Sequence, residues 1–136
     1  MDLTNSMSIS AAGMKAQGAR IRMISENIAN AKSTGTVPGE DPYRRKTITF
    51  SSVMDRDIGA FKVEVGRMGL DRSPFKRAHM PYHPMADATG YVNMPNVNTL
   101  IEMADLREAQ RSYEANVSVI ENARSMLMRT VDLLRS

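Results

Sequence analysis

The segment 99–135 constrains the fold of this chain more than any other. It contains no glycine and no proline. A sustained seven-residue apolar repeat is typical of a helix that packs against other helices in a coiled coil. As one helix, the segment would be about 55 Å long. The repeat consists of Leu106, Tyr113, Ile120, Leu127 and Leu134, with Val117 and Val131 on one flank and Ala109 and Ala123 on the other.

A start signal precedes this repeat. Thr99 and Glu102 have the three-residue spacing of a capping box, in which each side chain bonds the free backbone amide of the other residue. Pro95 lies upstream, where it cannot interrupt a helix. We therefore predict a single helix that begins at Thr99.

A second helix is predicted from residue 3 to about residue 33. Its seven-residue repeat is Met7, Met14, Ile21 and Ile28, and Gly35 and Pro38 supply stop signals. Asn27 and Asn30 interrupt the apolar stripe near its end. A polar side chain on a packed seam needs a partner and can fix the register between helices. We expect these two amides to bond a neighbouring helix or the turn that follows.

Residues 36–98 differ in character, since all six prolines and five of the eight glycines lie there. Two stretches, KTITF at 46–50 and FKVEV at 61–65, alternate apolar and polar residues as half-buried strands do. A third short strand is expected at 91–93. The sequence thus predicts an α+β chain in three parts: an N-terminal core helix (1–35), a β-rich insert with loops (36–98) and a C-terminal core helix (99–136).

Composition argues against most kinds of chemistry. The chain has no cysteine, which excludes a disulfide scaffold and a thiol nucleophile. His79 and His83 lie in a proline-rich stretch without an obvious third ligand, so we expect no metal, no cofactor and no catalytic residue. The net charge of +3 is weak for a nucleic-acid binder. The one dense basic cluster, with the tyrosine before it, is a candidate partner-contact loop: Tyr43, Arg44, Arg45 and Lys46.

Targeting signals are equally sparse. No run approaches the roughly 18 apolar residues of a membrane span, and the first ten residues lack the features of a cleavable signal peptide. We expect a cytoplasmic protein, or one exported by a route that uses no such signal. Two long helices around a thin insert would bury only one seam, which is marginal for stability. This favours a component of a larger assembly, although a simple helical hairpin or a homodimer shows the same stripe.

Four stretches resemble a known family. They are SENIANAKSTG, GEDPYRRKTITF, SMLMRTVDLL and the long run HPMADATGYVNMPNVNTLIEMADLREAQRSYEANVSVIENA. Together they are similar to the bacterial flagellar rod-rod-hook family of axial proteins, and within it to subunits of the proximal rod. The resemblance covers nearly the whole chain and is least diagnostic over 52–75. One departure is that many axial proteins place an aromatic residue directly after the loop glycine, whereas here Thr36 follows Gly35 and the first aromatic is Tyr43.

The resemblance implies a structural axial subunit without enzymatic activity. Such subunits are exported unfolded by the flagellar type III apparatus, without a cleaved signal, and assemble in the periplasm. Their terminal helices form the tubular core of the rod, while the middle segment lies outside it and contacts neighbouring subunits. The implied partners are copies of the chain itself, the rod proteins FlgB and FlgF, and the adaptor FliE at the membrane-embedded ring. Neither nucleic acid nor direct membrane insertion is implied.

On this interpretation the terminal helices carry the assembly interface, and a charge at Ile21 or Ile120 should abolish motility while leaving the β-rich insert folded. The expected interface residues are Met7, Met14, Ile21, Ile24, Asn27, Ile28, Asn30, Leu106, Tyr113, Val117, Ile120, Leu127 and Leu134.

Two other functions stay open at this point. One is a soluble coiled-coil binding or regulatory module that uses the basic cluster at 44–46 on an acidic partner. The other is a hydrolase built around the 79–90 loop. An isolated rod subunit should be largely monomeric with protease-sensitive ends, whereas a regulator should be a stable, highly helical dimer.

Overall fold

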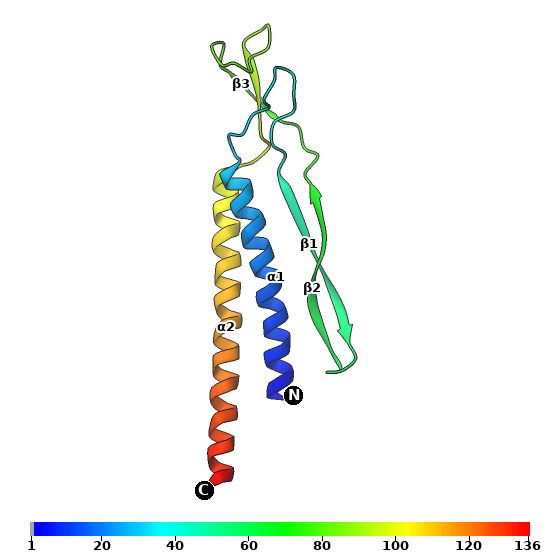
Figure 1. Cartoon of the computed structure of the whole chain (residues 1–136), viewed down its shortest axis with the longest axis vertical. Helices are drawn as coiled ribbons and strands as arrows, with labels where there is room; N and C mark the ends of the chain where they lie inside the picture. The colour runs from blue at the N-terminus through cyan, green and yellow to red at the C-terminus, as the bar shows by residue number, and fades with distance from the viewer. Residues whose placement is uncertain (1) are drawn as a thin grey trace. The chain divides into compact units, whose positions relative to one another are not determined.

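The described part of the chain folds into two long helices and two small two-stranded sheets (Figure 1). This computed structural model describes residues 2–136. The α+β class, with long terminal helices and a small β-rich middle, is confirmed. In chain order the elements are α1 (Leu3–Ala29), β1 (Lys46–Asp55), β2 (Ala60–Leu70), β3 (Lys76–His79), β4 (Tyr91–Met94) and α2 (Thr99–Arg135).

The C-terminal helix has the predicted bounds but a different cap. Asn98 is the N-cap residue, since the Leu100 N–H donates to its Oδ1 at 3.1 Å. The Glu102 side chain is 1% exposed and binds Asn27 and Arg45 instead of the helix start. The predicted capping box is therefore wrong, because a buried contact takes the carboxylate that the box requires.

The N-terminal helix ends at Ala29, about four residues before the predicted end. Asn30 Nδ2 donates to the Glu26 carbonyl at 2.9 Å, and the Ser33 hydroxyl donates to Asn30 Oδ1 at 3.1 Å. A side chain that bonds nearby backbone competes with continued helix. Asn30 therefore ends α1 within one turn, before the chain reaches Gly35.

The two sheets are separate hairpins. Strands β1 and β2 pair with each other and are longer than the alternating stretches predicted. Val63 and Val65 are half-buried, but Phe50 and Phe61 are exposed, so the prediction of a buried strand face holds only in part. The strand expected at 91–93 is β4, and its antiparallel partner β3 was not predicted, since KRAH does not alternate.

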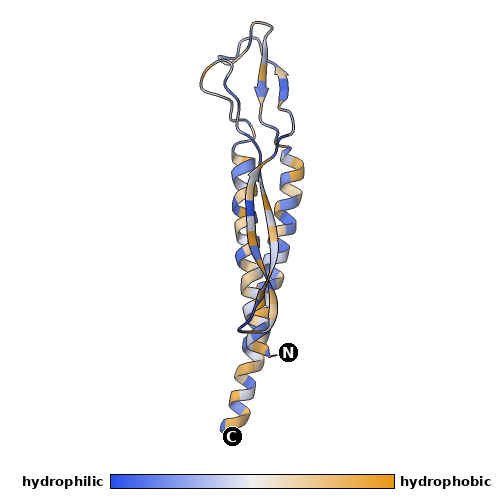
Figure 2. Ribbon diagram, turned by 90° about the vertical axis from the view of Figure 1, so that its right-hand side faces the viewer, coloured by the Kyte–Doolittle hydropathy of each residue, from blue (hydrophilic) through white to orange (hydrophobic). Residues whose placement is uncertain are grey.

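Apolar and polar residues alternate along both helices (Figure 2). Besides the seven-residue repeat, α2 carries large apolar residues at other positions, among them Ile101, Met103 and Met128. Across residues 2–136, no helix is both long enough and apolar enough to cross a bilayer.

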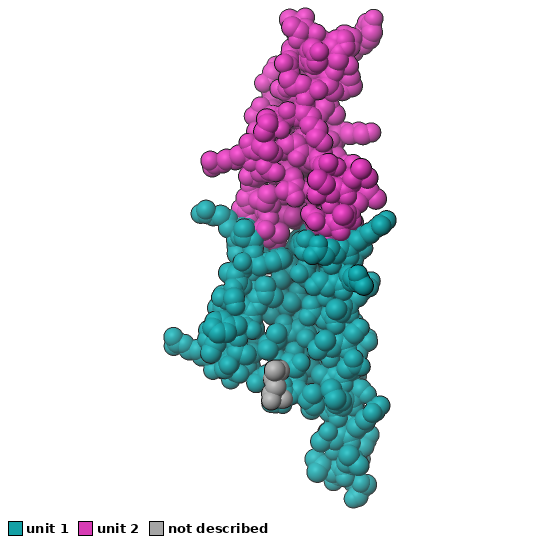
Figure 3. Space-filling model, turned by 180° about the vertical axis from the view of Figure 1, so that it is seen from behind, with its two compact units in different colours: residues 1–21, 49–67, 107–136 teal, residues 22–48, 68–106 magenta. Residues whose placement is uncertain are grey.

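Residue contacts divide the chain into two compact units (Figure 3). Unit 1 contains residues 1–21, 49–67 and 107–136, and unit 2 contains residues 22–48 and 68–106. Each unit takes one stretch of each helix and one stretch of the β1–β2 hairpin. Each unit therefore has its own helix–helix contact. The division into three parts along the chain stays a prediction.

The helix pair is antiparallel and closely packed. In unit 1, Gly13 lies against the Asn116 amide, and Arg20 and Glu108 form an ion pair at 3.7 Å. Residue numbers on α2 thus fall as those on α1 rise. The face of α2 that meets α1 carries Glu102, Ala109, Asn116 and Ala123, at seven-residue spacing, of which Asn116 is half-buried and the others are buried. Small side chains at this seam let the two helices approach closely. The predicted stripe of large apolar residues lies beside the seam.

Candidate assembly surfaces

A cluster of polar side chains, here called the polar junction, holds unit 2 together; Asn27, Asn96 and Glu102 are buried and the other members are half-buried. It consists of Asn27, Tyr43, Arg45, Lys46, Asn96 and Glu102. At its centre Asn27 is 0% exposed. Its Oδ1 accepts from the Lys46 N–H at 2.9 Å and from the Tyr43 hydroxyl at 2.8 Å. Its Nδ2 donates to the Lys46 carbonyl at 3.0 Å and to Glu102 Oε2 at 3.2 Å.

These four bonds use the full capacity of one carboxamide. The two bonds to Lys46 engage its N–H and its C=O together, as a neighbouring strand would. The amide of Asn27 therefore finds its partners in its own chain: Glu102 on the facing helix, Lys46 at the start of β1 and Tyr43 just before that strand. The amide of Asn30 bonds its own helix and the turn that follows.

Arg45 links the junction to β2 and α2. Its backbone N–H donates to Asn96 Oδ1 at 2.8 Å, and its carbonyl accepts from the Asp71 N–H at 2.8 Å. Its guanidinium bonds Glu102 and lies 3.6 Å from the Asp71 carboxylate. A buried carboxylate is tolerated when it is paired and hydrogen-bonded, as Glu102 is here.

All four residues of the candidate partner-contact loop have partners inside the chain. The Arg44 guanidinium stacks 4.1 Å above the Phe75 ring and donates to the carbonyls of Asp71 and Ser73. The Lys46 ammonium bonds Glu26 at 2.7 Å. Burial raises the pKa of the Tyr43 hydroxyl, and this hydroxyl donates to Asn27 Oδ1. A contact of this loop with another protein stays a prediction.

The predicted interface residues fall into three groups by exposure. Ile24 and Asn27 are buried within the chain, and Leu134 is 83% exposed. The others are half-buried, so each still presents part of its side chain to solvent: Met7, Met14, Ile21, Ile28, Asn30, Leu106, Tyr113, Val117, Ile120 and Leu127.

The structure adds apolar residues of α2 that are not in the predicted interface set. In unit 1 the C-terminal end of α2 extends past the start of α1, which leaves that end without a helical neighbour among residues 2–136 (Figure 1). The periodicity of the sequence selects only one stripe of α2. The residues outside that stripe are identified by their exposure in the structure. The exposed apolar residues are Leu100, Ile101 and Met103 in unit 2, and Val119, Met126, Met128, Val131 and Leu133 in unit 1.

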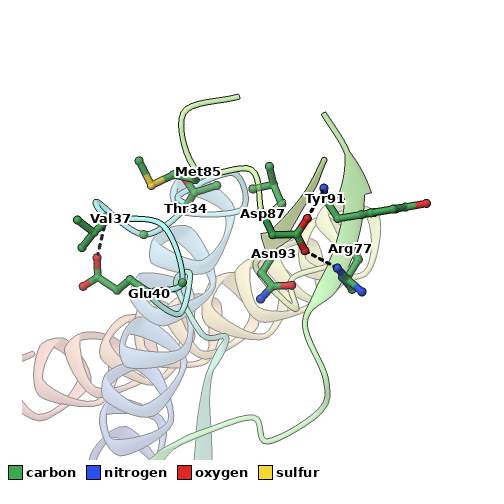
Figure 4. A pocket seen from close by; sticks show the side chains of 11 residues that line it. Thr34, Val37, Glu40, Arg77, Met85, Asp87, Tyr91 and Asn93 are labelled. Carbon is green, nitrogen blue, oxygen red and sulfur yellow. Dashed lines mark hydrogen bonds and ion pairs between the residues drawn. The ribbon is translucent and has the colours of Figure 1, made fainter. Parts of the chain in front are cut away.

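One cavity of about 350 Å³ lies in unit 2, between the 34–40 loop and the β3–β4 hairpin (Figure 4). Its charged groups are already engaged. Arg77 and Asp87 form an ion pair at 2.7 Å, and the Glu40 carboxylate accepts from the Thr36 and Val37 N–H groups. Among the residues that line this cavity, no nucleophile lies beside a base. Its two acidic side chains, Glu40 and Asp87, bond residues of their own loops.

Comparison with known proteins decides between the open alternatives. Residues 88–133 match the family model described as flagellar basal body rod FlgEFG protein C-terminal. Over 98% of its length the chain is 51% identical to the flagellar basal-body rod protein FlgC of Agrobacterium fabrum, of which it covers 96%. The FlgC proteins of Borreliella burgdorferi and Salmonella typhimurium are 37% and 36% identical, over 99% and 98% of the chain and 99% and 98% of their own lengths.

The chain belongs to the FlgC family. It is therefore a structural component of the flagellar basal-body rod, and it is not an enzyme. A rod component assembles with other rod components, which places this chain at the flagellar basal body. The polar junction and the exposed apolar residues of α2 are thus features of a rod subunit.

Proposed function

We propose that this FlgC-family chain builds the proximal rod by packing its two terminal helices against those of neighbouring subunits in the periplasm. Its partners are FlgB- and FlgF-like rod proteins, copies of itself and the adaptor FliE. It reaches the periplasm through the flagellar type III export apparatus, without a cleaved signal peptide. The interface consists of the half-buried and exposed members of the predicted set, with Ile24 and Asn27 holding the helix pair in register behind them.

The exposed apolar end of α2 is the observation that carries this proposal. Leu133 and Leu134 are 76% and 83% exposed, in a chain related over nearly its full length to rod proteins. Fully burying one leucine contributes about 1.5–3 kcal/mol, so these side chains offer an association energy that the single chain does not use. Neighbouring subunits that cover them would recover it.

Substitution of Leu134 by aspartate tests the proposal. Since Leu134 is exposed, Leu134→Asp should leave the unfolding of the isolated chain unchanged within about 0.5 kcal/mol. In cells that carry this gene as their sole copy, it should abolish swimming and remove the protein from purified basal bodies. The measurements are urea unfolding, swimming in soft agar, and immunoblotting of basal bodies.

Leu134→Met is the matched control, because it keeps an apolar side chain of similar volume. It should support normal swimming. Normal rods in the Leu134→Asp strain would contradict the helix interface. Ile120→Asp is a less clean test, because Ile120 is half-buried and a charge there also destabilises unit 1.

A further inference from the structure

A shallow groove in unit 2 has an apolar floor and a basic rim. Its volume is about 390 Å³. The floor runs from the turn after α1 to the β3–β4 hairpin and the start of α2. It consists of Ala31, Ala78, Met94, Pro95 and Val97, with Thr99 at one edge. Three cationic side chains line the rim, Lys32, Lys76 and Arg77, and none of the lining residues is acidic.

Two of these cations lack an acidic partner. Arg77 is paired with Asp87 at 2.7 Å. Lys76 donates to the Val97 carbonyl at 3.1 Å, and neither it nor Lys32 forms an ion pair with a carboxylate within residues 2–136. The groove therefore favours a ligand with apolar side chains and carboxylates beside them.

The chain itself carries such a surface on α2 in unit 1. Glu114 and Glu121 are exposed and seven residues apart, which puts them on one face of the helix about 10 Å from each other. Throughout the part of the chain that the structure describes, neither forms an ion pair. No basic residue lies between Arg111 and Arg124. Exposed apolar side chains flank the two glutamates: Ala115, Val119 and Met126.

We propose that the acidic face of α2 in one copy docks in the basic groove of a second copy. The contact rests on the proposed function and gives it a specific subunit-to-subunit interface. A helix laid into an apolar groove is a common recognition mode, and opposite charges at its rim select the partner and the register. Because the two surfaces differ, the contact is heterologous, and its repetition adds subunits in series and does not close a symmetric dimer.

Charge reversal and its rescue test this contact. Lys32→Glu with Lys76→Glu, or Glu114→Lys with Glu121→Lys, brings like charges together and should lower incorporation into basal bodies about tenfold or more. The four substitutions combined should restore incorporation to near the unmodified level. The measurement is the amount of subunit in purified basal bodies of cells lacking their own copy.

Cross-linking gives a readout that does not depend on the reversed variants folding. The native chain has no cysteine, so Lys32→Cys with Glu121→Cys introduces the only two thiols. A short bis-maleimide reagent should then produce cross-linked dimers in assembled rods. The control pair, Arg72→Cys with Glu121→Cys, places one thiol at an exposed position of unit 2 that does not line the groove, and it should give at least tenfold less dimer.

The outcomes separate this contact from the function on which it rests. Rescue by the combined variant, together with cross-links above the control, supports the contact. An unmodified chain that enters basal bodies, with neither rescue nor cross-link, overturns the contact and leaves the rod function standing. An unmodified chain that is absent from basal bodies overturns both.

Discussion

Asn27 is the residue on which the polar contacts of unit 2 converge. Asn27→Ala would leave the half-buried Lys46 N–H and C=O and one oxygen of the buried Glu102 without their partner. Each unsatisfied buried polar group costs about 1–3 kcal/mol, and partial relaxation and entry of water offset some of the total. We expect Asn27→Ala to lower the free energy of unfolding by about 2–4 kcal/mol, measured by urea denaturation.

Asn30→Ala is the matched control, since it removes the same side chain three residues later on the same helix. Asn30 is half-buried, and its amide bonds Glu26 and Ser33, which water can replace. The loss should stay below about 1 kcal/mol. Equal losses for the two variants would show that the junction does not depend on Asn27.

Asp87 shapes the loop before β4 through its charge. The Thr89 hydroxyl, and then the N–H groups of Tyr91 and Thr89, donate to its carboxylate and lower the pKa of that carboxyl to about 2. Because the folded pKa lies below the ordinary 3.8, the charged carboxylate stabilises the loop above about pH 4. This contribution is lost as the pH falls toward 2.

An NMR titration of the Asp87 carboxyl in the folded chain should give a midpoint near 2. The amide resonances of Thr89 and Tyr91 should shift with the same midpoint, because their N–H groups bond the carboxylate. In Asp87→Asn that step should disappear. A midpoint near the ordinary 3.8 would show that the loop does not hold the carboxylate in solution.

The spacing of residues in the sequence identified Asn27 as an amide that needs a partner, but it assigned Glu102 to a helix cap that does not form. An asparagine on an apolar helix stripe predicts a buried amide with a partner, which the structure confirms. Thr99 and Glu102 also fit a common local motif, yet the carboxylate bonds a residue 75 positions away. Local spacing carries no information on contacts at that separation, so the polar junction as a whole was not predicted.

At the scale of the helices, packing depends on how closely α1 and α2 approach. A Cβ at Gly13 would lie 2.9 Å from Asn116 Nδ2, whereas a Cβ at Gly18 would meet no atom within 4 Å. Alanine favours helix over glycine by about 0.5–1 kcal/mol. We expect Gly18→Ala to raise the free energy of unfolding by about that amount, and Gly13→Ala to raise it less or to lower it. Urea denaturation of both variants measures the difference.

The double variant Gly13→Ala with Asn116→Ala isolates the steric clash between the new methyl group and the Asn116 amide. Removing the amide makes room for the new methyl group. The double variant should therefore have a higher free energy of unfolding than Asn116→Ala alone, by the gain in helix propensity. The non-additivity of the two changes reports their contact. If Gly13→Ala stabilises the chain as much as Gly18→Ala does, the helices pack less closely than the structure has them.

Periodicity located both helices but did not settle which face of α2 meets α1. The seven-residue repeat in the sequence consists of the large apolar side chains at 106, 113, 120 and 127. The seam against α1 uses the neighbouring positions 102, 109, 116 and 123, which hold glutamate, asparagine and two alanines. Small and polar residues give a weak hydropathy signal. Only the packed structure separates the seam within the chain from the apolar surface beside it.

For the whole molecule, it matters that the seam with α1 and the exposed apolar surface lie on different faces of α2. One chain can therefore fold by itself and also join a polymer. The buried charge of the polar junction, Glu102, is paired and hydrogen-bonded by residues of the same chain, so unit 2 needs no partner subunit to stabilise it. The exposed apolar residues of α2 are not buried by other described parts of the chain. Since local stability follows local burial, the ends of the free chain should open more readily than the junction.

Hydrogen exchange of the free chain should show this difference directly. We expect fast exchange over 127–135, where α2 has no helical neighbour in the described part of the chain, and the slowest exchange over 22–29 and 99–106, around the polar junction. Brief trypsin digestion should cut first after Arg129, which is exposed. In purified basal bodies both the exchange and the cleavage of 127–135 should be suppressed, because neighbouring subunits cover that surface. A stable dimer of the isolated chain, with uniform protection along α2, would contradict this account and favour a self-contained coiled coil.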